Sequence, residues 1–365
     1  MYLVMKSSYY LRIALLFLSC SYILILCAPS YAQSKSVEGV NSAALSLHFE
    51  MPELGLTYEN CLQYIKKIGA SHVAINIQVT MEHTDSSSLR LKGSEVTKIE
   101  DVKRVLSMAK TIGLKVIIFP IIWVENRELG EWRGTLKPQD QNRWWSAYES
   151  WIGDLAALAE MYQVDYFSIG SELSSLEGEE GRWRALIRRI KGIYKGRLIY
   201  SANWDHFEEV SFWDDLDVIG ITAYYPLVQD GEKPTLESMR ERWLLIKAGL
   251  LDWLDYNFPK QKLFFSELGY PSQPGGATQP WHYLQSDQVD LNVQKEAFQA
   301  FREVWHTVPQ LLGVNIWNLW GLGGPHDAWY TVRGKPAAAE VQKLFQQLNV
   351  ISTDQSTPSI IKVNK

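Results

Sequence analysis

The sequence predicts one closed barrel of eight parallel strands that alternate with helices, the (β/α)₈ or TIM-barrel fold of the α/β class. Two observations predict it. Short runs of β-branched and aromatic residues alternate with amphipathic stretches, and the connections after these runs are much longer than the connections before them. The chain of 365 residues is long enough for such a barrel, which takes ~250 residues or more.

Eight apolar runs are the predicted strands. They lie at residues 43–49, 72–79, 115–121, 166–169, 197–201, 217–222, 263–266 and 313–317. Runs that are apolar on both faces are typical of parallel sheets covered by helices. A doubly wound open sheet is the alternative, but its first strand normally leads into a glycine-rich turn, and here Glu-Met-Pro-Glu follows at 50–53.

An amphipathic stretch is expected to follow each strand. The clearest stretch has apolar residues at intervals of three and four, as a helix with one buried face requires. These residues are Leu236, Met239, Trp243, Ile246, Leu250 and Trp253. The other predicted helices begin near Tyr58, Glu100, Trp144, Gly181, Asp290 and Lys335.

The connections that follow strands are long. They cover residues 80–99, 122–140, 223–234, 269–290 and 318–334. In a barrel of this kind all of them lie at the carboxyl end of the strands, where active sites are found. Residues at or just beyond the strand ends are therefore the first candidates for function.

The N-terminal segment, residues 1–32, has the pattern of an export signal. Lys6 and Arg12 precede an apolar stretch, and small residues around Ala32 provide a cleavage site. We expect the mature protein to be exported, either secreted or periplasmic, without stable membrane insertion. An uncleaved membrane anchor is the alternative, because the apolar stretch is only slightly shorter than a membrane span.

Residues 33–350 are expected to form the single barrel domain, followed by a disordered tail at 351–365 that is rich in Ser and Thr and lacks periodicity. The formal net charge is −5 and no basic run occurs, which argues against a nucleic-acid partner. The seven His residues form no His-Glu-x-x-His pattern, and the glycines at 321–324 follow the last strand without opening a helix. We expect no metal and no other cofactor.

Two glutamates stand at strand ends. Glu172 follows the fourth predicted strand and Glu267 follows the seventh, three strand-helix units of about 30 residues later. Both carboxylates are expected to reach one site from opposite sides. Two carboxyl groups ~5–5.5 Å apart can cleave a glycosidic bond with retention of configuration. The alternative is that each glutamate caps a helix or binds a loop amide, but a pair among aromatic loops favours catalysis.

Several longer motifs accompany the glutamates. They are the Trp-Trp pair and Tyr within 144–148, Asp-Tyr-Phe-Ser-Ile-Gly-Ser-Glu-Leu at 165–173, Ile-Gly-Ile-Thr-Ala-Tyr-Tyr-Pro-Leu at 219–227, Phe-Ser-Glu-Leu-Gly-Tyr at 265–270, Trp-Asn at 317–318 and Gly-Lys-Pro-Ala at 334–337. With these motifs the chain resembles the clan A glycoside hydrolases, and within the clan it is most similar to glycoside hydrolase family 113, whose members include β-1,4-mannanases. The resemblance implies a carbohydrate substrate, a β-linked polysaccharide or oligosaccharide and most directly a β-1,4-mannan, with Glu172 as acid/base and Glu267 as nucleophile.

The chain departs from the clan in one position. Much of the clan has Asn immediately before the acid/base glutamate, where it binds the sugar 2-hydroxyl, and this chain has Ser171. A Ser hydroxyl donates only one hydrogen bond, so Asn203 at the end of the fifth strand is a candidate for that contact. The alternative is a sugar whose 2-hydroxyl is oriented differently, as in mannose.

Other candidate binding residues lie at the same end of the predicted barrel. Tyr224 or Tyr225 can donate a hydrogen bond to Glu267 or can pack in the core, and the sequence does not choose between them. Trp317 is implied by the resemblance to lie under the sugar. Further candidates are Trp123, Trp204, Trp281 and Trp320 for stacking and His48 and Asn76 for hydroxyl contacts.

A second hypothesis is a carbohydrate-binding or cell-wall-associated barrel without hydrolytic activity, suggested by Ser171. The presence of both glutamates argues against it, because two neighbouring carboxylates repel each other and a binding protein has no need of that cost.

Overall fold

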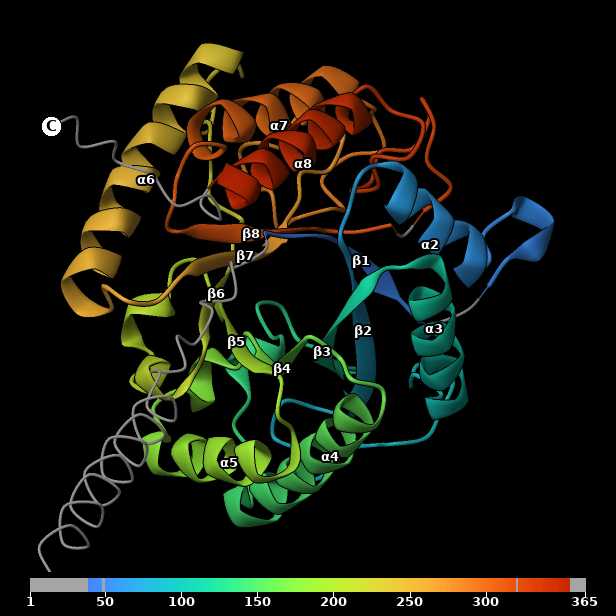
Figure 1. The fold of residues 1–365 in the computed structure, drawn as a ribbon, viewed down its shortest axis with the longest axis vertical. Coiled ribbons are helices and arrows are strands. Elements are labelled where there is room, and N and C mark those ends of the chain that lie inside the picture. Colours follow the sequence, from blue (N-terminus) through green and yellow to red (C-terminus); the bar gives the residue numbers. More distant parts are fainter. Residues whose placement is uncertain (1–38, 48–49, 320, 355–365) are drawn as a thin grey trace, which may run out of the picture. The chain divides into compact units, whose positions relative to one another are not determined.

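The computed structural model describes residues 39–47, 50–319 and 321–354, and its eight parallel strands pair in chain order and close into a barrel through β8 and β1 (Figure 1). The predicted barrel is confirmed. The strands are β1 Val40–Ser46, β2 His72–Met81, β3 Lys115–Val124, β4 Tyr166–Ser171, β5 Arg197–Asn203, β6 Val218–Thr222, β7 Leu263–Leu268 and β8 Leu311–Ile316. The predicted export signal, His48, Trp320 and most of the predicted tail lie outside the described residues.

Seven α-helices surround the described barrel (Figure 1). They are α2 Tyr58–Lys67, α3 Ile99–Ile112, α4 Gln141–Met161, α5 Glu180–Ile193, α6 Leu236–Asn257, α7 Leu291–Trp305 and α8 Ala337–Asp354. Side chains that accept hydrogen bonds from free amides fix several helix starts: Thr57 precedes α2, Asp140 precedes α4 and Asp290 precedes α7. The helix predicted near Trp144 therefore begins three residues earlier than expected.

The expectation of a helix after every strand is wrong for β5. The segment between β5 and β6 forms two short 3₁₀ turns, η4 Phe207–Glu209 and η5 Trp213–Asp215. Phe212 and Trp213 are fully buried and contact the ring of Tyr200 on β5, with ring centroids 5.3 Å and 6.0 Å away. These two large side chains cover the strand where a helix would otherwise pack.

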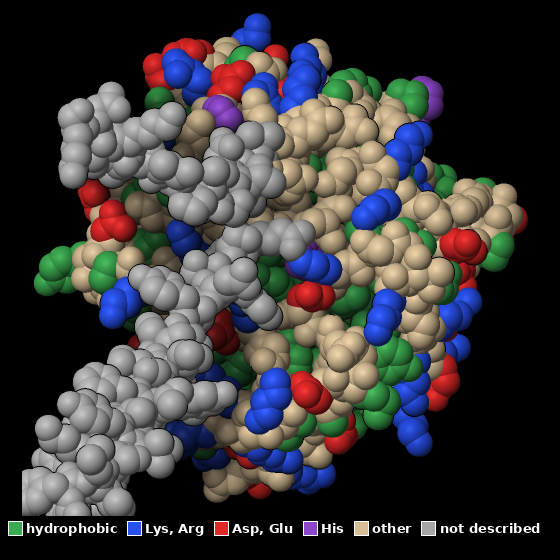
Figure 2. Space-filling view, in the orientation of Figure 1, with side chains coloured by type: hydrophobic (Ala, Val, Ile, Leu, Met, Phe, Trp, Pro, Cys, Tyr) green, Lys and Arg blue, Asp and Glu red, His purple; other side chains and the backbone are tan. Residues whose placement is uncertain are grey.

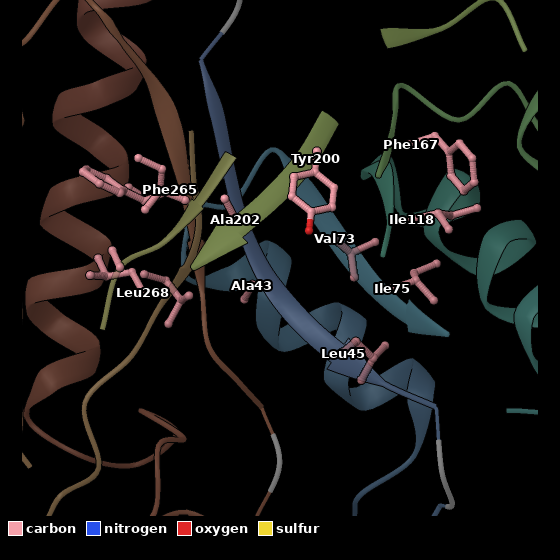
Figure 3. Close-up of a cluster of buried hydrophobic side chains, with 14 of the residues drawn as sticks. Ala43, Leu45, Val73, Ile75, Ile118, Phe167, Tyr200, Ala202, Phe265 and Leu268 are labelled. Atoms are coloured by element: carbon pink, nitrogen blue, oxygen red, sulfur yellow. The ribbon is translucent and has the colours of Figure 1, made fainter. Parts of the chain in front are cut away.

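The hydrophobic core has two parts, because alternate residues of each strand face opposite sides of the barrel wall. One part lies between strands and helices, and Figure 3 shows some of its members, including Ala43, Leu45 and Phe265. Phe265 on β7 contacts Trp305 of α7 edge to face at 4.8 Å. The second part fills the barrel interior with Val40, Ala74, Ile117, Phe119, Tyr166, Ile199, Val218, Phe264 and Leu312.

The surface of the described chain carries both signs of charge. Lys and Arg side chains are interspersed with Asp and Glu over the face shown in Figure 2. None of the helices among the described residues has the length and apolar character that a membrane crossing needs. A few charged residues are buried instead, and two of them, Glu172 and Glu267, belong to the site described next.

Candidate active site

Glu172 lies immediately after β4 with an unusual backbone conformation. Its φ angle is 53°, in the left-handed region that residues other than glycine seldom adopt, and its amide donates to the carbonyl of Ser201 on β5 at 2.7 Å. The register between β4 and β5 also shifts between Ser168 and Ser171. This local irregularity determines where the Glu172 side chain begins, and only 4% of the residue remains exposed.

Gly170 shows how tightly the end of β4 is packed. A Cβ atom at this position would lie 2.8 Å from the hydroxyl of Tyr148 and 3.0 Å from the ring of Tyr200. The Tyr148 hydroxyl donates to the carbonyl of Ile169 at 2.7 Å. The predicted motif Ile-Gly-Ser-Glu thus needs glycine for steric reasons, and the surrounding aromatic side chains hold the strand that carries Glu172.

Glu267 lies within β7 and is only 3% exposed. The register of β7 is irregular against both neighbouring strands near this residue, and Thr222 of β6 is its partner. The hydroxyl of Tyr224, two residues beyond β6, donates to Glu267 Oε2 at 2.7 Å. Of the two alternatives for Tyr224, the structure therefore has the hydrogen bond to Glu267.

Arg133 connects the two glutamates. It begins the 3₁₀ turn η2 Arg133–Thr135 in the long connection between β3 and α4. Its Nη2 atom lies 2.5 Å from Glu172 Oε2 and 3.9 Å from Glu267 Oε1. The sequence analysis missed this residue. The available signal is the Trp-Arg-Gly sequence at 132–134, inside one of the long connections that end at the carboxyl face.

Thr222, at the last position of β6, is a second residue that the sequence analysis missed. Its hydroxyl donates to Glu172 Oε1 at 2.5 Å and also lies 3.2 Å from Asn203 Oδ1. Both oxygens of Glu172 therefore have a hydrogen-bond donor, Thr222 on one and Arg133 on the other. The side chain is held from two sides of the barrel.

Burial and mutual repulsion control the protonation of the pair. Burial raises the pKa of Glu267, the negative charge of Glu172 raises it further, and the positive charge of Arg133 and the Tyr224 hydroxyl oppose this shift. Burial and the charge of Glu267 also raise the pKa of Tyr224, so its hydroxyl remains a neutral donor. For Arg133, burial favours the neutral form, but both glutamates hold its pKa above the ordinary value. The site thus combines one guanidinium that stays charged with two carboxyl groups that favour a single shared proton.

Asn203 and Ser171 lie beside this pair in different ways. Asn203 donates to Asp205 at 2.8 Å, and its oxygen accepts from the amide of Trp204 at 3.1 Å. Ser171 is buried, and its hydroxyl has no hydrogen-bond partner within the described part of the chain. Asn203 therefore reaches Glu172 only through Thr222, and Ser171 adjoins Glu172 along the chain.

The predicted aromatic residues fall into separate groups. Trp204 stacks on Trp281 with ring centroids 5.9 Å apart and planes 22° apart, and it also contacts Tyr225 at 5.3 Å. Trp123 lies under the guanidinium of Arg127 at 4.1 Å. Trp317 follows β8, and its amide donates to the carbonyl of Leu268 at 2.9 Å. The structure thus joins Trp204, Trp281 and Tyr225 into one aromatic group.

Within the described residues, no three His, Cys, Asp or Glu side chains are arranged so that they could hold a metal ion. The chemistry that the described side chains offer is acid and base chemistry. One carboxyl group of such a pair can donate a proton while the other acts as an anion towards the same bond.

The comparisons with known proteins agree with this geometry. The model of Glycoside Hydrolase Family 113 matches residues 56–323, which is well over half of the chain. Among solved structures, the β-mannanase of family 113 from Alicyclobacillus acidocaldarius in complex with ManMIm has a TM-score of 0.74 and 23% identity over 86% of this chain and 100% of that one. A family 113 β-1,4-mannanase has a TM-score of 0.72 and 22% identity over 85% of this chain and 99% of that one.

More distant structures share the barrel. A β-D-glucuronidase from Dictyoglomus thermophilum has a TM-score of 0.57 and 15% identity, over 85% of this chain and 50% of that one. No curated protein sequence matches the chain. At these identities the structural likenesses show the fold, whereas the family model matches the sequence over most of the barrel. The chain therefore belongs to glycoside hydrolase family 113 and is a glycoside hydrolase.

Proposed function

We propose that the protein is a retaining β-mannanase that cleaves β-1,4-mannan by double displacement. The observation that carries the mechanism is the spacing of the two carboxyl groups. Since both distances start at Arg133 Nη2, one oxygen of Glu172 and one of Glu267 are at most about 6.4 Å apart, the sum of 2.5 Å and 3.9 Å. Inverting enzymes separate their carboxyl groups by ~6.5–9.5 Å to admit a water, and retaining enzymes by ~5–5.5 Å.

The roles proposed for the two residues are those that the resemblance to the clan A glycoside hydrolases implies. Glu172 protonates the departing glycosidic oxygen while Glu267 attacks the anomeric carbon and forms a covalent glycosyl-enzyme. Glu172 then removes a proton from water, which releases the sugar with its original configuration. Tyr224 holds the Glu267 carboxylate through its hydroxyl, 2.7 Å away.

The choice of mannan is supported by two similar structures, which are described as β-mannanases. The aromatic group of Trp204, Trp281 and Tyr225, together with Trp317, Trp123 and the polar residues Asn203 and Ser171, is proposed to bind the sugar chain. The non-hydrolytic alternative has no support in the described contacts, since both glutamates lie in one hydrogen-bonded site.

Export is a further part of the proposal, supported by the signal pattern at residues 1–32. The mature enzyme would then begin after Ala32. The disordered tail predicted from residue 351 is wrong for its first four residues, because α8 continues to Asp354, and the tail is therefore proposed over residues 355–365. N-terminal sequencing of the protein recovered outside the cytoplasm tests this point. An intact residue 1 in the exported protein contradicts cleavage and supports the uncleaved anchor.

A substrate panel and proton NMR test the function. Release of reducing ends is measured on soluble mannan, glucan, xylan and galactan, and mannan is expected to react fastest. The first product in the NMR spectrum should be the β-anomer, because two inversions restore the original configuration. A faster reaction on another polymer contradicts the mannan assignment, and a first product in the α form contradicts the retaining mechanism.

A further inference from the structure

We propose that Arg133 is a positioning residue that moves its charge from Glu172 to Glu267 when substrate binds, and so directs the shared proton to Glu172. This inference rests on the proposed retaining mechanism, which needs Glu172 protonated and Glu267 ionised at the moment of attack. The contacts in the structure favour the opposite distribution. Arg133 lies 2.5 Å from Glu172 and 3.9 Å from Glu267, so it stabilises an anion on Glu172 first.

The resting contacts also block the proposed acid. Arg133 donates to Glu172 Oε2 and Thr222 donates to Oε1, so each carboxyl oxygen already accepts a hydrogen bond. A carboxylic acid that protonates a glycosidic oxygen must present one oxygen with its proton towards that atom. Thr222 belongs to the barrel wall, whereas Arg133 comes from a connection. The Arg133 contact is therefore the one that the departing oxygen of the substrate displaces.

Glu267 offers the guanidinium a nearby second position. Tyr224 binds Glu267 Oε2, and the other oxygen, Oε1, is the atom 3.9 Å from Arg133 Nη2. A displacement of about 1 Å would bring this pair to the usual length of a charge-assisted hydrogen bond. The buried Nε atom of Arg133 makes no hydrogen bond with the described residues. A rotation of the guanidinium therefore breaks no hydrogen bond between Nε and a described residue.

The proton balance of this step is simple. One proton leaves Glu267 and one proton is taken up by Glu172, so the charge of the site stays the same. The tyrosines around the pair bring no charge that would compete with Arg133, because burial raises the pKa of Tyr200, Tyr224 and Tyr330 and keeps them neutral. Glu177, which also acts electrostatically on Glu172, has its pKa raised by burial to about 7.

The test uses Arg133→Gln, Arg133→Lys and, as a control in the same connection, Lys137→Gln, whose side chain is exposed. The probe is 2,4-dinitrophenyl β-mannoside, because its leaving group departs without a proton and the rate depends on Glu267 ionisation alone. At pH 6 the Arg133→Gln variant should lose about 10-fold to 100-fold in kcat/KM, corresponding to one to two pKa units. The loss should disappear once the pH exceeds the pKa of Glu267 in the variant, since Glu267 then ionises without help. On mannan, whose departing oxygen must be protonated, no such recovery is expected.

The movement itself is tested by comparing two pH profiles. The profile of kcat/KM reports the free enzyme, and the profile of kcat reports the substrate complex. If Arg133 moves onto Glu267, the midpoint of the rising limb in the wild-type kcat profile should lie about one pH unit below the midpoint in the kcat/KM profile. Arg133→Gln should remove this difference between the two midpoints. Arg133→Lys keeps the charge but has a single ammonium group, so the difference between its two midpoints should be intermediate. This variant replaces Arg133→Gln if the Gln variant does not fold.

The outcomes separate this inference from the proposed function. If the wild-type protein and Lys137→Gln release neither reducing ends from mannan nor dinitrophenol from the aryl mannoside, the proposed function fails and the role of Arg133 fails with it. If both are active and the Arg133 variants lose the same fraction of activity at every pH, Arg133 has only a structural role. If the difference between the kcat and kcat/KM midpoints persists in Arg133→Gln, the proposed movement of Arg133 is also wrong.

Discussion

The barrel interior has two halves that the same strands build from different residues. Near the amino ends of the strands it is filled by apolar side chains such as Ile199 of β5 and Phe264 of β7. Two or three residues further along the same strands come Ser201 and Glu267, which belong to the polar end. In the lower half the aliphatic and phenyl side chains need no hydrogen-bond partner, and the Tyr166 hydroxyl accepts from Arg197, whereas the upper half consists largely of polar groups that need partners. Stability and chemistry are thus separated along each strand.

The two ends of the barrel also differ in how burial changes the pKa of a titratable side chain. At the amino end of β2, burial lowers the pKa of His72 to about 3, and the charges of Lys115 and Arg197 lower it further, so His72 stays neutral at all ordinary pH values. At the carboxyl end, burial and a neighbouring anion raise the pKa of Glu267. Only the second group exchanges a proton in the pH range of an enzyme. The location of a titratable group along the barrel therefore decides whether it is chemically active.

The largest expected effect comes from the two glutamates of the upper half. Glu267→Ala should be inactive on mannan and on 2,4-dinitrophenyl β-mannoside, with a loss of ~10³-fold or more in kcat/KM, because no covalent intermediate can form. Glu172→Ala should fail on mannan but still release the first equivalent of dinitrophenol, since that leaving group needs no proton. Stopped-flow absorbance measures this burst.

Azide provides the control for the Glu172 variant. A small anion fits the space left by the carboxylate and attacks the glycosyl-enzyme without a general base, so azide should restore turnover of Glu172→Ala and leave Glu267→Ala inactive. Equal losses for both variants on the aryl glycoside would show that the two roles are assigned wrongly.

The sequence predicted the barrel and both glutamates because these depend on periodicity and on position at strand ends. Strand starts were less accurate: the first strand begins at Val40, three residues before the prediction, since an apolar pattern does not mark where pairing begins. Arg133 and Thr222 could not be singled out. Their importance depends on distances across the barrel, 2.5 Å in each case to Glu172, between residues far apart in the chain.

The lower half of the barrel should respond to mutation through stability. Phe264→Ala removes a fully buried ring from the apolar side chains that fill the barrel interior. It should reduce the free energy of unfolding by about 3–5 kcal/mol, measured by urea denaturation. Leu129→Ala, at an exposed position, is the control and should have almost no effect. The folded fraction of Phe264→Ala should keep the wild-type pH profile. A shifted profile would mean that the two halves are not separate.

Glu177, in the connection between β4 and α5, links pH to stability. It accepts a hydrogen bond from Tyr200 at 2.7 Å, and burial raises its pKa from 4.5 to about 7. Between these values the folded state holds a proton that the unfolded state has lost, so stability falls as the pH rises from 4.5 to 7 and is level above. Glu177→Gln should abolish this contribution, which amounts to up to about 3 kcal/mol.

The measurement for Glu177 is the free energy of unfolding of both proteins between pH 4 and pH 8. The difference between wild type and Glu177→Gln isolates this residue, because other groups titrate in both proteins. A difference that stays constant with pH would show that Glu177 has the same pKa in the folded and unfolded states, and would contradict the pKa shift caused by burial.

The smallest expected effect concerns the outer part of the polar end, where side chains are proposed to bind the sugar chain without taking part in the reaction. Trp281 is 46% exposed and stacks on Trp204, so its free face is available to a sugar ring. Stacking of this kind contributes ~1 kcal/mol, so Trp281→Ala should raise KM for mannan about five-fold to ten-fold and leave kcat unchanged. The aryl mannoside, which has one sugar ring, should be hydrolysed normally. Tyr256→Ala, an exposed aromatic on α6, is the control. If Trp281→Ala weakens both substrates equally, then Trp281 acts on the catalytic residues themselves, and binding of the extended chain is not its role.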